Sequence, residues 1–182
     1  MYTFEDRSGN SLSMKPESTA GVVRAYIENG MSSLPKPTKL FYIEPHFRYE
    51  RPQAGRYRQH HQLGAEIFGD GSAQSDVHTI ALGCRVLNDL GIEHKVSINS
   101  IGSVQDRKNY AEALVNYFEK YRQDLPDINQ SQLNNNVLRI LDSKDPEVIK
   151  LVDDAPQILD YLSKESSARF QSVLEMLEGC GL

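Results

Sequence analysis

Hydrophobic and polar residues alternate along two stretches of the chain, residues 40–50 and 58–68. Alternation with a period of two is typical of β-strands, because successive side chains of a strand point to opposite faces. Pro52 and Gly55 lie between the two stretches and favour a turn. The sequence therefore predicts a β-hairpin, with charged and hydrogen-bonding side chains at its even-numbered positions and a mostly apolar, packed face at its odd-numbered positions.

Shorter patterns flank this hairpin. Residues 2–14 alternate on either side of Ser8-Gly9-Asn10, which predicts another small hairpin. Apolar residues recur at helical spacing in residues 17–30 and 75–91, and a glycine ends each run. Residues 94–102 are expected to begin a further strand. The first hundred residues are thus expected to mix strands and helices.

The pattern becomes helical after Gly102. Ser103 and Asp106 have the spacing of a capping box, in which each side chain bonds the other residue's backbone N–H at the start of a helix. Further helical segments are expected around 131–141, 145–152, 155–162 and 164–178, with a polar loop at 129–136. The sequence therefore predicts an α+β fold in two domains, residues 1–102 and an all-helical domain at 103–182.

Composition narrows the class of protein. The 182 residues are 39% hydrophobic and 25% charged, with a formal net charge of −5, which is typical of a globular protein and argues against indiscriminate nucleic-acid binding. No apolar run approaches the roughly 18 residues that span a membrane. Cys84 and Cys180 are far apart and lack the spacing of metal ligands. We therefore expect a cytoplasmic protein with no membrane span and no metal-ligand cluster.

The polar face of the predicted hairpin is unusual in its residue types. It carries Arg, Glu, His and Gln but no Lys, Ser or Thr. Arginines on a rigid strand present a planar fork to phosphate or carboxylate groups, and Gly64 removes a side chain among them, which leaves room for a ligand. A solvated face of an amphipathic hairpin is the alternative. His46 lies on the polar face and is a weak site candidate, whereas His61 lies on the apolar face and is expected to be a core histidine.

Four segments, in order, resemble one family. The stretch FRYERPQAGRYRQHHQLGAEIFG (47–69) resembles motif 2 of the class II aminoacyl-tRNA synthetases, in the form found in bacterial histidyl-tRNA synthetases. LSMKPESTAG (12–21) resembles the histidine-binding segment of that family, and INSIG (98–102) and LRILDSKDPEV (138–148) are similar to its later segments. The resemblance implies part of an antiparallel class II synthetase sheet with flanking helices, followed by a helical insertion domain over the acceptor end of tRNA.

The resemblance implies that residues of motif 2 bind and activate ATP. Arg48 would bind the α-phosphate and the histidine carboxylate. It would stabilise the charge that builds up as the carboxylate attacks phosphorus, which is electrostatic catalysis without a covalent protein intermediate. Arg56 would act with it at the outer phosphates. Glu50 would contact the adenine end, and His60 stands where an aromatic residue usually stacks on adenine.

The resemblance also implies a histidine site. Glu17, Ser18 and Thr19 belong to the histidine-binding segment, in which Glu17 and Thr19 would hold the α-amino group together with Gln62. Glu66 would accept a hydrogen bond from the imidazole N–H. It would discriminate against side chains that lack this donor, because a buried polar group left unpaired costs about 1–3 kcal/mol or more.

The chain departs from the family pattern at four positions. Lys15 replaces an arginine, Ser18 and Glu44 replace glycines, and His60 replaces the stacking aromatic residue. Glu44 brings an additional negative charge near the phosphates. His60 retains a flat ring, so that it can still stack on a base.

The implied function is attachment of histidine to its tRNA through a histidyl-adenylate. ATP and Mg²⁺ are the implied cofactors, and the partners are histidine, the tRNA(His) acceptor end and a second copy of the complete protein. Arg107, Lys108 and Arg139 are the expected basic contacts of the helical domain to RNA. Motif 1 would precede residue 1, and motif 3 and the anticodon-binding domain would follow Leu182, so we expect a catalytic fragment that is weak or inactive alone.

Two other functions stay open. One is a synthetase-like regulatory subunit of histidine biosynthesis, which would bind histidine and not tRNA. The other is a remnant whose helical domain is a protein- or RNA-binding module. The Glu-Arg-Pro-Gln-Ala-Gly-Arg-Tyr-Arg run at 50–58 and the helical insertion favour the true synthetase.

Overall fold

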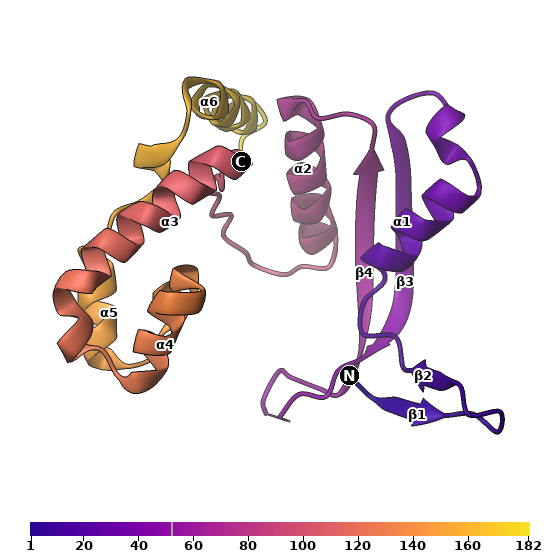
Figure 1. The fold of residues 1–182 in the computed structure, drawn as a ribbon. Helices are drawn as coiled ribbons and strands as arrows, with labels where there is room; N and C mark the ends of the chain where they lie inside the picture. Colours follow the sequence, from indigo (N-terminus) through magenta and orange to yellow (C-terminus); the bar gives the residue numbers. More distant parts are fainter. Residues whose placement is uncertain (52) are drawn as a thin grey trace. The chain divides into compact units, whose positions relative to one another are not determined.

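The chain divides into two compact units, Met1–Leu82 and Gly83–Leu182. Figure 1 shows their elements, which are described unit by unit below. The structure is a computed structural model that describes residues 1–51 and 53–182. Pro52, the proline of the predicted turn, lies outside the described residues.

The first unit combines two antiparallel strand pairs with a helix. Its elements are β1 (Thr3–Glu5), β2 (Ser11–Ser13), α1 (Thr19–Glu28), a 3-10 turn (Met31–Ser33), β3 (Thr38–Phe47) and β4 (Gln59–Phe68). Both predicted hairpins are present, because β1 pairs with β2 and β3 pairs with β4 (Figure 1). Helix α1 contacts β4, where the rings of Tyr26 and Phe68 stack with their centroids 4.4 Å apart.

The register of β3 and β4 defines the two faces of the long hairpin. Tyr42 lies opposite Gly64 and His46 lies opposite His60, so that the even-numbered residues share one face as predicted. This polar face is the more covered of the two: Tyr42 is 8% exposed and His46 is fully buried. The rings of these two residues meet edge to face, with centroids 5.9 Å apart.

The odd-numbered face is exposed, which corrects the prediction that it is packed. Phe41, Ile43 and Leu63 have exposed fractions of 76%, 64% and 50%. His61 is exposed on the same face, so its assignment as a core histidine is wrong. Two strands can pair and still leave one face bare, because a hairpin buries a face only where another element lies on it.

Strand β3 is shorter at its C-terminal end than the alternating pattern suggests. It ends at Phe47, so Arg48 and Glu50 follow the strand instead of lying within it. One backbone hydrogen bond continues the pairing, from Arg48 N–H to Arg58 O (2.9 Å). Arg48, the arginine expected to catalyse the reaction, therefore lies between the end of β3 and the turn of the hairpin.

Helix α2 (Ala73–Asp89) confirms a predicted helix, and the division between the two units falls within it. The strand expected at 94–102 is wrong, because residues 92–103 form neither helix nor strand. An extended segment becomes a strand only where a neighbour supplies hydrogen bonds, and no strand of the described residues pairs with this one. The functional domain boundary at Gly102 stays a prediction.

The second unit is helical. Its elements are α3 (Val104–Phe118), α4 (Asp127–Asn135), α5 (Pro146–Asp153) and α6 (Lys164–Gly179), with 3-10 segments at Glu119–Asp124, Val137–Asp142 and Ile158–Tyr161. The predicted capping box is confirmed, since Ser103 Oγ accepts from Asp106 N–H (3.1 Å) and Asp106 Oδ2 accepts from Ser103 N–H (2.8 Å). The loop expected at 129–136 is wrong, because burial of Leu133 stabilises α4 despite its polar sequence.

The core of the second unit forms where α3 meets α4, α5 and the 3-10 segment between them. Leu114 and Phe118 come from α3, and Ile140 and Val148 come from the following segments. All four side chains have no exposed surface. Every residue of this core belongs to the second unit.

Asp106 joins the starts of α3 and α6. Besides its bond to Ser103, its carboxylate accepts from Ser163 N–H (3.0 Å) and from Ser166 Oγ–H (2.6 Å). The hydrogen bonds from Ser166 and Ser103 lower the pKa of Asp106 to about 2, against the opposing effect of burial. A single carboxylate thus fixes two helix N-termini.

Candidate active site

The predicted histidine-binding segment and the predicted motif 2 meet at the end of β3. Phe47 N–H donates to Lys15 O (2.9 Å), and Arg48 Nε donates to Pro16 O (2.9 Å). Arg48 and Pro16 are 32 positions apart in the sequence. Arg48 is therefore attached to the segment that carries Glu17.

That segment ends at the start of helix α1. Ser18 occupies the N-cap position, but its hydroxyl accepts no hydrogen bond from the helix. The carboxylate of Glu17 takes this place and accepts from Ala20 N–H (3.2 and 3.3 Å for its two oxygens). Ser18 is buried and Thr19 is exposed. The segment thus offers a carboxylate and a hydroxyl beside a helix N-terminus.

The turn beyond β3 carries charges of both signs. Arg56 Nη1 lies 3.7 Å from Glu50 Oε2, and the two side chains are 63% and 44% exposed. Arg58 Nε donates to Glu50 O (3.2 Å), and its guanidinium lies over the ring of Tyr49. An exposed ion pair of this kind contributes little energy. The Arg56 guanidinium is therefore held only weakly by Glu50.

The space at Gly64 is not open, which corrects the expectation that it leaves room for a ligand. A Cβ atom at Gly64 would lie 2.1 Å from Tyr42 Cζ, because the tyrosine ring crosses from the opposite strand. Tyr42 Oη accepts a hydrogen bond from Gln62 Nε2 (3.2 Å). The backbone of Glu66 pairs with that of Leu40 in the hairpin, but its side chain forms no hydrogen bond or ion pair with another described residue. Gln62 is thus oriented by Tyr42, and the Glu66 carboxylate keeps its acceptor sites.

Three of the four departures from the family pattern contact each other. Lys15 forms an ion pair with Glu44, and Ser18 Oγ–H donates to Glu44 Oε1 (3.4 Å). Lys15 therefore offsets the charge that Glu44 adds. Ser18 Oγ also lies 2.7 Å from His46 Nε2. Ser18 and His46 do not have the arrangement of a catalytic nucleophile and its general base. Ser18 is buried, and no described group forms a hydrogen bond with His46 Nδ1 to orient the ring.

His46 is fully buried on the polar face, near the C-terminal end of β3. The sequence around it did not predict this burial. Burial lowers the pKa of His46 below its usual value, and electrostatic interactions with Lys15, His60 and Arg48 lower it further, while Glu17 opposes them. The ring is therefore neutral at pH 7. Its one sequence signal was its position on the even-numbered face.

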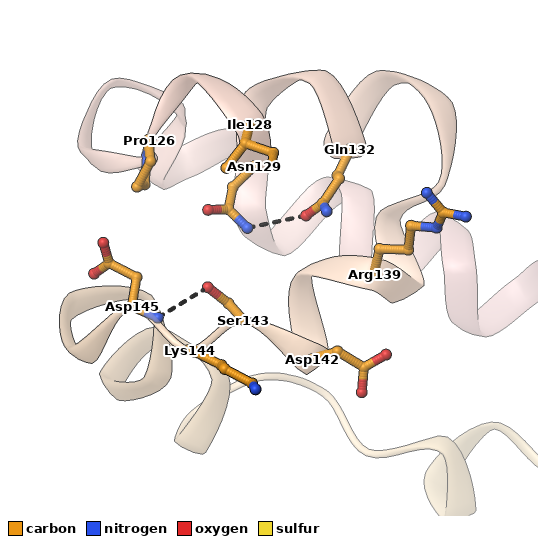
Figure 2. Close-up of a pocket in the computed structure, with 9 residues that line it drawn as sticks. All are labelled: Pro126, Ile128, Asn129, Gln132, Arg139, Asp142, Ser143, Lys144 and Asp145. Atoms are coloured by element: carbon orange, nitrogen blue, oxygen red, sulfur yellow. Dashed lines mark hydrogen bonds between the residues drawn. The ribbon is translucent and has the colours of Figure 1, made fainter. Parts of the chain in front are cut away.

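A separate pocket of about 470 Å³ lies in the helical unit, between the start of α4 and the start of α5 (Figure 2). Arg139 and Lys144 line it together with two aspartates. Asn129, which is 3% exposed, also lines it and donates to Gln132 Oε1 (3.0 Å). Arg139 thus lies beside a pocket whose lining includes charged and amide side chains.

Neither a metal cluster nor a membrane span is found in the described part of the chain. No three His, Cys, Asp or Glu side chains of residues 1–51 and 53–182 are grouped so that they could hold a metal ion. Across the same residues, every helix is too short or too polar to traverse a bilayer.

A match to a known family shows the class of protein to which the hairpin and its attached N-terminal segment belong. Residues 2–174 match the family described as the tRNA synthetase class II core domain (G, H, P, S and T). The chain belongs to this family. The resemblance of its motif 2 segment to class II synthetases is thereby confirmed.

Individual relatives point to one member of the class. The chain is 48% identical over 183 residues to the histidine–tRNA ligase of Thermosynechococcus vestitus and 47% identical over 185 residues to that of Lactobacillus helveticus. Both matches cover 100% of this chain and 43% of the relative. The chain thus spans less than half the length of the curated relatives it matches, and the resemblance to histidyl-tRNA synthetases is confirmed.

One solved structure agrees with this assignment, and a second shares the fold. The apo histidyl-tRNA synthetase of S. aureus matches with a TM-score of 0.76 and 36% identity, over 100% of this chain and 42% of that one. This match confirms the predicted α+β fold. An ATP phosphoribosyltransferase regulatory subunit/histidyl-tRNA synthetase from Bacillus halodurans C matches with a TM-score of 0.60 and 23% identity, over 99% of this chain and 50% of that one, which shows a shared fold.

Proposed function

We propose that this chain forms the histidine- and ATP-binding part of a histidine–tRNA ligase. The observation that carries the proposal is the bond from Arg48 to Pro16, which joins the motif 2 arginine to the segment with Glu17 and Thr19. The reaction must bring the histidine carboxylate to the α-phosphorus of ATP. A guanidinium attached to the amino-acid-binding segment is placed to hold both groups, and such positioning is a major source of catalysis.

Arg48 would act by electrostatic stabilisation. Its Nε donates to Pro16 O, so its two Nη groups can bind the histidine carboxylate and the α-phosphate. A carboxylate oxygen attacks the α-phosphorus, the bond to pyrophosphate breaks, and histidyl-adenylate forms. Arg56 would leave Glu50 for the outer phosphates, Glu50 would meet the adenine end, and His60 would stack on the base.

Histidine would lie along the polar face of the hairpin. Glu17 and Thr19, in the segment that also contains Ser18, would hold the α-amino group with Gln62. Glu66 would accept the imidazole N–H, since its carboxylate has no other partner in the described part of the chain. Gln62 is already oriented by its bond to Tyr42 and needs little reordering on binding.

Mg²⁺ would enter with ATP and not through a protein cage. The described residues offer no three-ligand cluster, and Mg²⁺ commonly keeps several waters and binds through one or two carboxylates and the substrate phosphates. When bound, it would neutralise charge on the outer phosphates. The complete protein would act in the cytoplasm as a homodimer.

The helical unit would contact the acceptor end of tRNA(His). Arg139 and Lys144 in the pocket can bind phosphate, and Asn129 can bond a base edge. Arg107 and Lys108 are exposed on α3 and would add phosphate contacts. Titration with an acceptor-stem RNA should show a salt slope that falls by about one for each phosphate contact removed. Arg139→Ala and Lys144→Ala should lower the slope, and Lys164→Ala should leave it unchanged.

Calorimetric titration tests the synthetase proposal without requiring turnover. The chain is titrated with histidine, with ATP and with a non-hydrolysable histidyl-adenylate mimic. We expect saturable binding of the mimic that is lost in Arg48→Ala and in Glu66→Ala. Arg24→Ala and Glu28→Gln, which change charges on α1 outside the site, should bind normally. Binding that is equal in all five proteins would refute the assignment of the site.

The regulatory alternative makes a different prediction. A histidine sensor would bind histidine alone and ignore ATP and the acceptor-stem RNA. The relatives at 47–48% identity carry the name histidine–tRNA ligase, which favours the synthetase.

A further inference from the structure

Ser18 uses its side chain in an unusual way for an N-cap residue. A serine at this position normally accepts a hydrogen bond from the first turn of the helix. Here Glu17 performs that role, and Ser18 Oγ lies 2.7 Å from His46 Nε2 and 3.4 Å from Glu44 Oε1 instead. The Ser18 hydroxyl therefore connects the start of α1 to strand β3.

The ring of His46 has no other hydrogen-bond partner in the described part of the chain. The side chain is fully buried, and its Nδ1 atom is unpaired. If Nε2 carries the proton, it donates to Ser18, and Ser18 is free to donate to Glu44. The opposite tautomer would bury an unpaired N–H, which is rarer and costlier than an unpaired acceptor. The favoured arrangement is thus a chain of donors from His46 through Ser18 to Glu44, which Lys15 ends by an ion pair.

We propose that His46 is a positioning residue that holds the segment of residues 15–19 against β3 through its bond to Ser18. This inference rests on the proposed function to the extent that Glu17 and Thr19 in this segment bind histidine. Two further hydrogen bonds join the same segment to residues at the end of β3, from Phe47 N–H to Lys15 O and from Arg48 Nε to Pro16 O. Loss of the His46 bond should loosen both.

The surroundings of His46 keep its ring neutral at neutral pH. Lys15, His60 and Arg48 disfavour a second proton on His46, and burial does so more strongly, so that the pKa of His46 is lowered. Glu17 acts in the opposite direction, and Glu44 is already paired with Lys15. A neutral imidazole with one N–H can donate to Ser18 without burying an uncompensated charge.

Hydrogen exchange of the Phe47 amide tests the proposal directly, because this amide donates to Lys15 O. Exchange is measured by NMR on the full chain, together with the ¹⁵N signals of the His46 ring. We expect Ser18→Ala and His46→Leu to accelerate exchange by about fivefold or more, the effect of one lost hydrogen bond. His46→Gln, which keeps a donor near the position of Nε2, should restore much of the protection. His61→Leu is the matched control on the exposed face.

Each outcome decides the matter. Acceleration in Ser18→Ala with a shifted His46 ring signal, and none in His61→Leu, supports the proposal even if His46→Leu does not fold. Unchanged exchange in Ser18→Ala, or equal acceleration in His61→Leu, overturns it. Histidine titration of the same proteins distinguishes a failure of the proposed histidine binding from a failure of the positioning role of His46. If the unmodified chain binds no histidine, the proposed function fails for this chain, whereas the exchange data still decide whether His46 positions the segment.

Discussion

Replacing Gly64 by alanine tests how the hairpin packs its polar face. The added Cβ would lie 2.1 Å from Tyr42 Cζ, 2.3 Å from its Oη and 2.5 Å from its Cε1. An ordinary contact is about 3.4 Å or longer, so the ring must move by more than about 1 Å. Tyr42 is 8% exposed and its ring is rigid, so this movement displaces neighbours.

The expected cost has two parts. Overpacking of a well-packed site costs about 1–3 kcal/mol. The hydrogen bond from Gln62 to Tyr42, which the movement breaks, contributes about 1 kcal/mol. Gly64→Ala should therefore lower the free energy of unfolding of the first unit by about 2–4 kcal/mol, taking these two terms together. Histidine binding should weaken as well, because Gln62 loses its orientation.

Urea unfolding followed by tyrosine fluorescence measures the effect, since the chain has nine tyrosines and no tryptophan. Gly21→Ala is the matched control in α1, where a Cβ meets nothing within 4 Å; this change should stabilise the helix by up to about 1 kcal/mol. In a Tyr42→Ala background, Gly64→Ala should lose most of its cost. An unchanged or raised stability of Gly64→Ala in the unmodified background would refute the packing described here.

Three further changes probe the rest of the molecule. Leu114→Ala, at a fully buried position, should destabilise the helical unit by about 2–5 kcal/mol in thermal unfolding. Asp106 stabilises the folded state fully above its unfolded pKa of about 3.9, and this contribution is lost as the pH falls towards the folded pKa of about 2. Asp106→Asn should therefore lower the Tm at pH 7 and flatten the dependence of Tm on pH between about 4 and 2. Phe41→Thr, on the exposed face, should change stability by no more than about 0.5 kcal/mol.

The sequence pattern predicted helices and strands correctly where interactions between neighbouring residues determine them. The capping box of Ser103 and Asp106 and the two hairpins follow from neighbouring residues alone. The pattern failed where tertiary contacts decide. Residues 129–136 look like a polar loop, yet Leu133 fixes them as a helix against the core. Residues 94–102 look like a strand, yet no described strand pairs with them.

The faces of the long hairpin show the same limit. Alternation correctly divided its residues into two sets, but it cannot say which set is covered. Apolar residues suggested that the odd-numbered set is packed, whereas Phe41 and Ile43 are exposed. The role of Gly64 was also misjudged, because the space beside a strand glycine belongs to its cross-strand partner. That partner, Tyr42, follows from the register and not from the sequence near Gly64.

The departures from the family pattern cannot be judged one at a time. Ser18 and Glu44 are 26 positions apart, so the sequence gives no sign that they touch. Glycine at position 18 alone would leave the His46 ring without its partner, and glycine at position 44 alone would leave Lys15 without its ion-pair partner. Residues in contact typically show interaction energies of about 0.5–3 kcal/mol. Lys15, Ser18 and Glu44 are in contact, so the effects of replacing them are expected to be coupled and not additive.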